Sequence, residues 1–127
     1  MNIGLWVLQV LLAALFGMAG AFKLFTPIEE LARQMSWVDA SSPALARFIG
    51  ASELAGAIGL IVPAATRIAP RLTPLAAAAL ALVMVLAAGT HVLHNEMAGV
   101  ALPVVLALLS GLVAWGRWVR APIAPRA

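Results

Sequence analysis

Four long runs of apolar residues, separated by short polar segments, dominate the pattern of this chain. The runs cover residues 3–25, 45–63, 74–93 and 99–119. A bilayer core about 30 Å thick needs about 20 residues of helix, so each run is long enough to cross it. In lipid the backbone must satisfy its own hydrogen bonds, which favours helices. The pattern therefore predicts an all-α fold, a bundle of four transmembrane helices.

Proline positions set the expected ends of these helices. We expect the first helix to end before Pro27 and the second to stop at Pro63, because proline removes a backbone donor and breaks helices. Pro103 falls in the first turn of the fourth helix, where proline is tolerated. The first run could instead be a signal peptide, with residues 19–21 as its cleavage site. Against that, no Lys or Arg precedes the run, and it is long for such a peptide.

The polar connections differ in length and in charge. Residues 26–44 form the one long loop, within which residues 29–34 can form a short amphipathic helix at the interface. The turn at 64–73 and the tail carry five arginines, whereas the opposite side carries Lys23, Arg33 and Arg47. Lys and Arg concentrate on the cytoplasmic side of membrane proteins. We therefore expect both termini in the cytoplasm and the long loop outside.

Composition agrees with a membrane protein. The 127 residues are 64% hydrophobic and 10% charged, whereas soluble domains average roughly 45–50% apolar and 25% charged residues. Four spans with short connections use the whole length, so residues 1–127 are expected to form a single transmembrane domain. We expect a multi-pass protein of the cell membrane, which in a bacterium is the inner membrane.

Several chemistries are disfavoured by what the sequence lacks. It contains no cysteine, which removes disulfides and thiol catalysis. It has no glycine-rich phosphate loop, no zinc-ligand cluster and no nucleic-acid-binding motif. The net charge of +3 comes mostly from arginines near helix ends, a placement that suits lipid headgroups. We therefore expect no metal and no nucleic-acid partner.

Glu53 is the residue that points to a site. It lies within an apolar run, where a charged side chain costs roughly 2.5–3.5 kcal/mol on insertion scales and normally faces the bundle interior with a partner. The helical period places it on one face with Gly50 and Gly56. These small neighbours leave space beside the carboxylate for another helix or for a ligand.

Other ionisable residues converge on the same outer half of the bundle. Lys23 ends the first span and His91 lies near the end of the third, while Arg47 begins the second. Lys23 is the better partner for Glu53, and His91 with His94 can line one groove. Each also has a plainer interpretation. Lys23 and Arg47 would be interfacial anchors, His94 a solvated side chain, His91 a structural histidine, and Glu53 half of an ion pair that fixes helix register.

The order of these residues resembles the DoxX-like family of small membrane proteins. Residues 20–24 (GAFKL) are similar to the G-x-x-K-L ending of the first span in that family. Residues 47–56 resemble its R-x-x-G-x-x-E-x-x-G pattern. His91 near the end of the third span and Pro103 early in the fourth also fit. The resemblance covers essentially the whole chain, although its motifs are short.

The resemblance implies a four-helix membrane protein and two kinds of function. Members are named for a subunit of a thiosulfate:quinone oxidoreductase, and others are linked to membrane oxidative-stress complexes. A eukaryotic relative is an assembly chaperone for nicotinic receptors. A shared fold does not settle the chemistry, so both a redox role and an assembly role stay open.

Our preferred interpretation is a subunit or partner of a quinone-linked redox system with an outward-opening polar pocket. Glu53, Lys23 and His91 would bind or protonate a quinone or a similar lipid-like molecule, because a quinone oxygen needs a proton donor. The surrounding ligand-binding residues would be Arg47, Gly50, Gly56 and His94. No haem, flavin or iron–sulfur site is visible, so no cofactor is evident and a quinone is the one that the site could take. We expect no redox turnover from the isolated chain.

Two other functions remain in view. One is a non-enzymatic assembly or scaffold protein, in which a Glu53–Lys23 pair only holds the bundle. The other is a membrane-bound isomerase that acts on a lipid-like substrate. The expected partners are the lipid bilayer, a lipid-like small molecule, and a membrane or peripheral redox protein. We also leave open a homo-oligomer.

Overall fold

The computed structural model describes residues 1–39 and 41–126, and within these the chain is helical. The elements are α1 (Asn2–Phe25), α2 (Ile28–Gln34), α3 (Ala44–Thr66), α4 (Leu72–Leu93), η1 (Met97–Gly99), α5 (Ala101–Trp115) and η2 (Gly116–Arg120). In this part of the chain, four segments are long and apolar enough to span a membrane: α1, α3, α4 and the continuous segment Met97–Arg120. The predicted all-α bundle with four spans is therefore confirmed.

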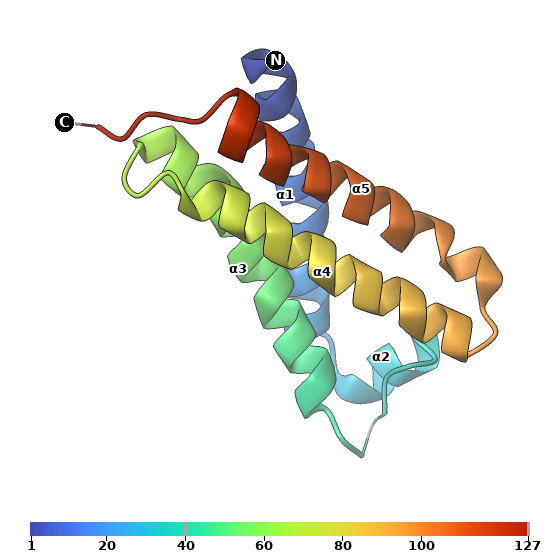
Figure 1. Cartoon of the computed structure of the whole chain (residues 1–127). Coiled ribbons are helices and arrows are strands. Elements are labelled where there is room, and N and C mark those ends of the chain that lie inside the picture. The colour runs from blue at the N-terminus through green and yellow to red at the C-terminus, as the bar shows by residue number, and fades with distance from the viewer. Residues whose placement is uncertain (40, 127) are drawn as a thin grey trace.

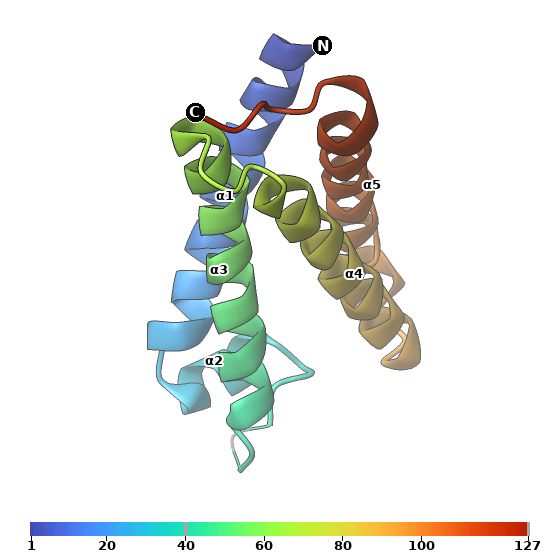
Figure 2. The same cartoon turned by 60° about the vertical axis from the view of Figure 1, so that its left-hand side comes forward.

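The spans pack as two close pairs, α1 with α3 and α4 with α5, and the contact between α3 and α4 joins the pairs. Figures 1 and 2 show both termini and the α3–α4 turn at one end of the molecule, which we call the terminal end. The opposite end carries α2 and the α4–η1 turn, and we call it the loop end. In Figure 2 the α1–α3 pair and the α4–α5 pair diverge toward the loop end. The cytoplasmic location of the termini stays a prediction.

Apolar side chains from all four spans meet in one core. Its fully buried members include Leu12 and Phe16 of α1, Leu60 of α3, Leu80 of α4 and Val113 of α5. Many other large apolar side chains stay exposed along the spans, such as those of Ile3, Leu82 and Leu108. Such exposure suits helices that are surrounded by hydrocarbon, because the bilayer core lacks water.

The second span does not stop at Pro63, so that prediction was wrong. Helix α3 runs through Pro63 to Thr66, with the proline buried inside it. Proline has no N–H to donate to the carbonyl of Gly59, four residues earlier. The hydroxyl of Thr73 on α4 donates to that carbonyl instead, at 2.9 Å. The helix therefore continues because a neighbouring helix satisfies the freed backbone oxygen.

The predicted short helix in the long loop is present as α2. Its Leu31 is completely buried and packs with Val38 and with Ala46 at the start of α3. On its exposed side, Arg33 and Gln34 both donate to the carboxylate of Glu30, each at 3.1 Å. Helix α2 therefore rests against the beginning of α3, close to Arg47.

Candidate functional site

Glu53 and Lys23 form an ion pair across the α1–α3 contact. Lys23 Nζ donates to Glu53 Oε1 at 2.5 Å. The Glu53 side chain is 2% exposed and the Lys23 side chain 13% exposed. Lys23, the expected partner of Glu53, is therefore the residue that pairs with it in the structure.

Two glycines bring the backbones of α1 and α3 together at this pair. A Cβ atom added at Gly20 would lie 2.6 Å from the carbonyl oxygen of Gly50, and one added at Gly50 would lie 2.8 Å from Cβ of Lys23. Only glycine permits an approach as close as this one. Small residues are common at the contacts between membrane helices for the same reason. The close contact sets the base of the Lys23 side chain directly against α3, within reach of Glu53.

Arg47 holds the end of α1 in place. Its Nη1 donates to the carbonyls of Lys23, Leu24 and Thr26 at 2.8, 3.0 and 2.7 Å. The last carbonyls of a helix have no partner within the helix and carry partial negative charge, so a cation is favourable there. Arg47 therefore fixes the residue that pairs with Glu53 without itself contacting the carboxylate. Its expected role in ligand binding stays a prediction.

The ion pair retains hydrogen-bonding capacity. An ammonium group carries several N–H donors, but Lys23 Nζ donates to Glu53 alone among the described residues. Likewise, no described residue donates to the second carboxylate oxygen of Glu53. Free hydrogen-bond donors and a free acceptor thus lie side by side at the contact between two apolar spans, α1 and α3.

The space expected beside the carboxylate is occupied by protein. At Gly56, an added Cβ atom would lie 2.6 Å from the Leu80 side chain of α4. At Gly50 the neighbour is α1, as described above. In this structure both glycines serve helix packing, so a ligand would have to approach the pair from the partly exposed Lys23. Their role in ligand binding stays a prediction.

His91 lies in a separate polar cluster at the loop end. Its Nδ1 is 3.5 Å from Glu96 Oε1, and Ser36 of the long loop donates to the same oxygen at 2.7 Å. Gly99 closes the other side, because a Cβ atom there would lie 2.7 Å from His91 Nδ1. Across residues 1–39 and 41–126, no hydrogen bond or ion pair joins His91 to Glu53 or Lys23. Its action together with Glu53 stays a prediction.

His94 is exposed at the end of α4. Its backbone N–H donates to the carbonyl of Thr90 at 3.1 Å. The imidazole of His94 makes no hydrogen bond with another described residue. The groove that we expected His91 and His94 to share also stays a prediction.

A second buried charge, that of Arg117, was not predicted from the sequence. Arg117 is 3% exposed, and its Nε donates to Gln9 Oε1 at 2.6 Å while its Nη1 donates to Asn2 Oδ1 at 2.7 Å. Gln9 in turn donates to the carbonyl of Leu60 at 2.7 Å, and the Trp6 ring lies 5.5 Å from the guanidinium carbon. We call Asn2, Gln9 and Arg117 the Arg117 cluster. The sequence feature that could have indicated this cluster is Gln9, a polar side chain in the middle of an apolar run.

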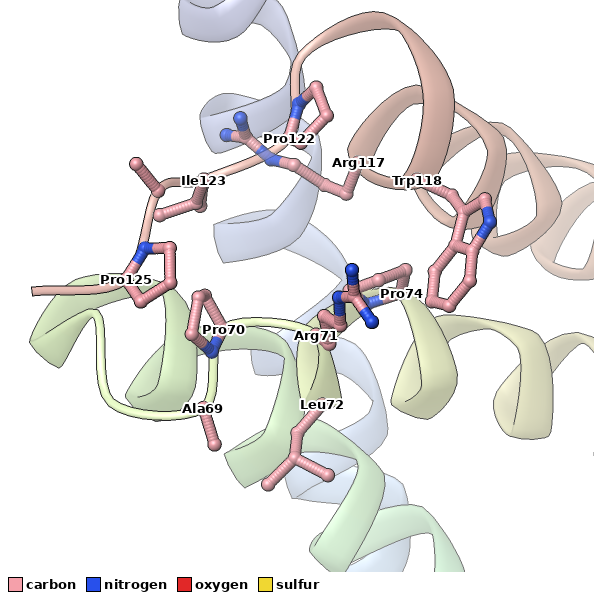
Figure 3. A pocket seen from close by; sticks show the side chains of 11 residues that line it. Ala69, Pro70, Arg71, Leu72, Pro74, Arg117, Trp118, Pro122, Ile123 and Pro125 are labelled. Atoms are coloured by element: carbon pink, nitrogen blue, oxygen red, sulfur yellow. The ribbon is translucent and has the colours of Figure 1, made fainter.

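Two cavities of about 700 and 470 Å³ lie at the terminal end. Figure 3 shows the larger one, between the α3–α4 turn and the C-terminal segment. Neither is lined by Lys23 or Glu53, so an outward-facing pocket beside the ion pair stays a prediction. Within the part of the chain that the structure describes, no group of three or more His, Asp or Glu side chains is arranged to hold a metal ion.

A family model described as DoxX-like matches residues 7–113. The matched segment contains the Lys23–Glu53 pair, Arg47 and His91. Comparisons with curated proteins and with solved structures gave no match. Since the family model covers most of the chain and four apolar helices can span a bilayer, this multi-pass membrane protein belongs to the DoxX-like family.

Proposed function

We propose that this protein is a subunit or partner of a quinone-linked redox system in the cell membrane, and that Lys23 and Glu53 bind a quinone or a similar carbonyl-bearing lipid. One observation carries the proposal. Among the described residues, nothing else pairs with the remaining donors of the Lys23 ammonium or with the second carboxylate oxygen of Glu53. Ionisable groups within membrane spans commonly mark ligand or proton pathways.

The chemistry of the pair matches both forms of a quinone. A quinone carbonyl oxygen accepts hydrogen bonds, and the ammonium of Lys23 can donate one. A quinol hydroxyl donates hydrogen bonds, and the free oxygen of Glu53 can accept one. Reduction adds electrons together with protons. The electrons would come from a redox centre on a partner protein, while Lys23 and Glu53 would bind the head group and exchange protons with it.

Rigidity around the pair supports a binding role. The Gly20–Gly50 contact fixes the spacing between α1 and α3, and Arg47 fixes the end of α1 through three carbonyls. A site whose side chains are held by packing and by further hydrogen bonds binds at lower entropic cost. Lys23, being partly exposed, is the side from which a lipid would reach the pair.

A second candidate function is a non-enzymatic assembly or scaffold protein. The observation that favours it is the tight packing of Leu80 against Gly56 and of α1 against Gly50. With these contacts the Lys23–Glu53 pair would only fix the register of α1 and α3. Buried ion pairs can contribute such specificity without adding net stability.

Bound lipid separates the two candidates. The wild type and Glu53→Gln would be purified in mild detergent, and lipids that stay bound would be identified by mass spectrometry. Glutamine keeps an oxygen that can accept from Lys23, so we expect the variant to fold with reduced stability and to lose the bound quinone. Glu30→Gln, which changes a half-exposed carboxylate in α2, should retain it.

Two results would contradict the quinone proposal. The first is a folded Glu53→Gln protein that retains as much quinone as the wild type. The second is a wild type that carries no quinone but co-purifies with a stoichiometric protein partner, a result that would favour the assembly function.

A further inference from the structure

Charge is divided unevenly between the two ends of the molecule. The five carboxylate side chains are those of Glu29, Glu30, Asp39, Glu53 and Glu96, and none of them belongs to the α3–α4 turn or to the chain after Gly116. The α3–α4 turn, η2 and the C-terminal segment lie at the terminal end (Figure 1), and they carry Arg67, Arg71, Arg117, Arg120 and Arg126. The terminal end is therefore strongly cationic and has no acidic side chain to neutralise it.

The larger cavity lies within this cationic region. It has a volume of about 700 Å³, within the usual range of ligand pockets, roughly 300–1,000 Å³. Its walls come from three segments: the turn Ala69–Leu72 with Pro74, the side chains of Arg117 and Trp118, and the tail Pro122–Pro125. Figure 3 shows these side chains in a ring around the open space.

The two arginines of this cavity differ in what their guanidinium groups contact. The head of Arg117 points away from Arg71 (Figure 3) and is held by Gln9, Asn2 and the carbonyl of Ala121. Arg71 is exposed and lies 5.9 Å from the Trp118 ring. The guanidinium of Arg71 makes no hydrogen bond or ion pair with any residue in 1–39 or 41–126, and only its backbone carbonyl accepts one, from Leu75 N–H. Its planar set of N–H donors is therefore available to a ligand.

The location of the cavity identifies the class of ligand. Trp118, which lines the cavity, is 54% exposed, and tryptophans at span ends occupy the headgroup level of a bilayer. Guanidinium groups bind phosphate through paired, charge-assisted hydrogen bonds. Basic pockets between transmembrane helices accept anionic lipid headgroups. The apolar surfaces of the spans next to the cavity would carry the acyl chains.

We propose that this cavity binds the phosphate of an anionic glycerophospholipid, with Arg71 as the phosphate ligand and Trp118 as the wall that orients its guanidinium. The proposal does not depend on the quinone site, since neither Lys23 nor Glu53 lines this cavity. The other source of the same chemistry is a soluble phosphate ester, and the experiment distinguishes the two.

Lipid retention in native mass spectrometry tests the site. The protein would be equilibrated with mixed phosphatidylcholine and phosphatidylglycerol micelles. Arg71→Gln should lower retained phosphatidylglycerol by about tenfold or more, as expected for the loss of a charge-assisted hydrogen bond. The matched control is Arg120→Gln. Arg120 lies at the same end and stacks on Trp115 at 5.7 Å, but does not line the cavity, so this variant should retain the lipid.

A variant that keeps the charge gives a second measurement. Ala124→Trp places a large side chain in the cavity wall without removing an arginine, and it should also lower retention. Equal losses for Arg71→Gln and Arg120→Gln would overturn the proposal, because they indicate general attraction to a cationic surface. So would unchanged retention by Ala124→Trp, or a wild type without preference for phosphatidylglycerol. Displacement of the lipid by sn-glycerol 3-phosphate would overturn the lipid assignment in favour of soluble phosphate esters.

Discussion

The Lys23–Glu53 pair and the Arg117 cluster both place charge inside apolar helices, but they compensate for it differently. At the pair, a cation meets an anion at 2.5 Å, and the local charge sums to zero. In the Arg117 cluster the guanidinium donates to neutral oxygens of Gln9, Asn2 and Ala121 and lies beside the Trp6 ring, and no acidic side chain among the described residues pairs with it. One site relies on charge neutralisation, whereas the other relies on neutral hydrogen-bond acceptors and an aromatic ring.

Depth accounts for this difference. Glu53 lies about eight residues, or ~12 Å, from the start of the second span, where an uncompensated charge is most costly. Arg117 lies in the last turns of the final span, close to the polar interface. A long arginine side chain near a helix end can reach that interface. A buried cation is therefore tolerated at the terminal end without an acidic partner.

The largest expected effect is the loss of one member of the ion pair. Lys23→Met should lower the free energy of unfolding by about 3–5 kcal/mol, because it leaves the Glu53 carboxylate buried without a counter-charge. The double variant Lys23→Met/Glu53→Gln should regain much of that loss. Equilibrium unfolding in detergent micelles would measure the coupling between the two positions. Strictly additive losses would show that charge neutralisation is not what stabilises the pair.

A smaller effect is expected in the Arg117 cluster. Gln9→Leu removes the acceptor of Arg117 Nε and the donor to the Leu60 carbonyl. The cost should be about 1–3 kcal/mol, the usual penalty for leaving buried polar groups unsatisfied. The same unfolding assay applies, with the exposed pair variant Arg33→Gln as the control. A loss of stability as large as that of Lys23→Met would mean that the Arg117 cluster and the ion pair do not differ in how they compensate for buried charge.

The smallest effect concerns a neutral hydrogen bond at the level of Pro63. Thr73→Val removes the hydroxyl that donates to the Gly59 carbonyl and should cost about 1 kcal/mol. Thr90→Val is the matched control, because the Thr90 hydroxyl donates only to Leu86 of its own helix, whose carbonyl already has a helical partner. Equal stability changes in both variants would argue against the role assigned to Thr73.

The spans and the ion pair could be predicted from the sequence because both follow from the membrane as a solvent. About 20 apolar residues in a row are needed to cross the hydrocarbon core, and the runs that meet this condition match the helices closely. A carboxylate in such a run requires a partner, and Lys23 was the expected cation because its long side chain can reach inward from the end of the first span. These are local conditions on length, hydropathy and charge.

Other features depend on contacts that only the tertiary structure decides. The helix continues past Pro63 because Thr73 of another helix supplies the missing donor. Arg117 and Gln9 are far apart in the sequence, so nothing local indicated that they meet. A small residue such as Gly56 can border either a cavity or a side chain of a neighbouring helix, and helix packing decides which. In this structure Leu80 of α4 fills the space beside Gly56. The sequence by itself determined which segments lie in lipid and which charge needed compensation, since transfer energies depend on residue type. The partners and the filled spaces depend on helix packing, which is a property of the assembled bundle.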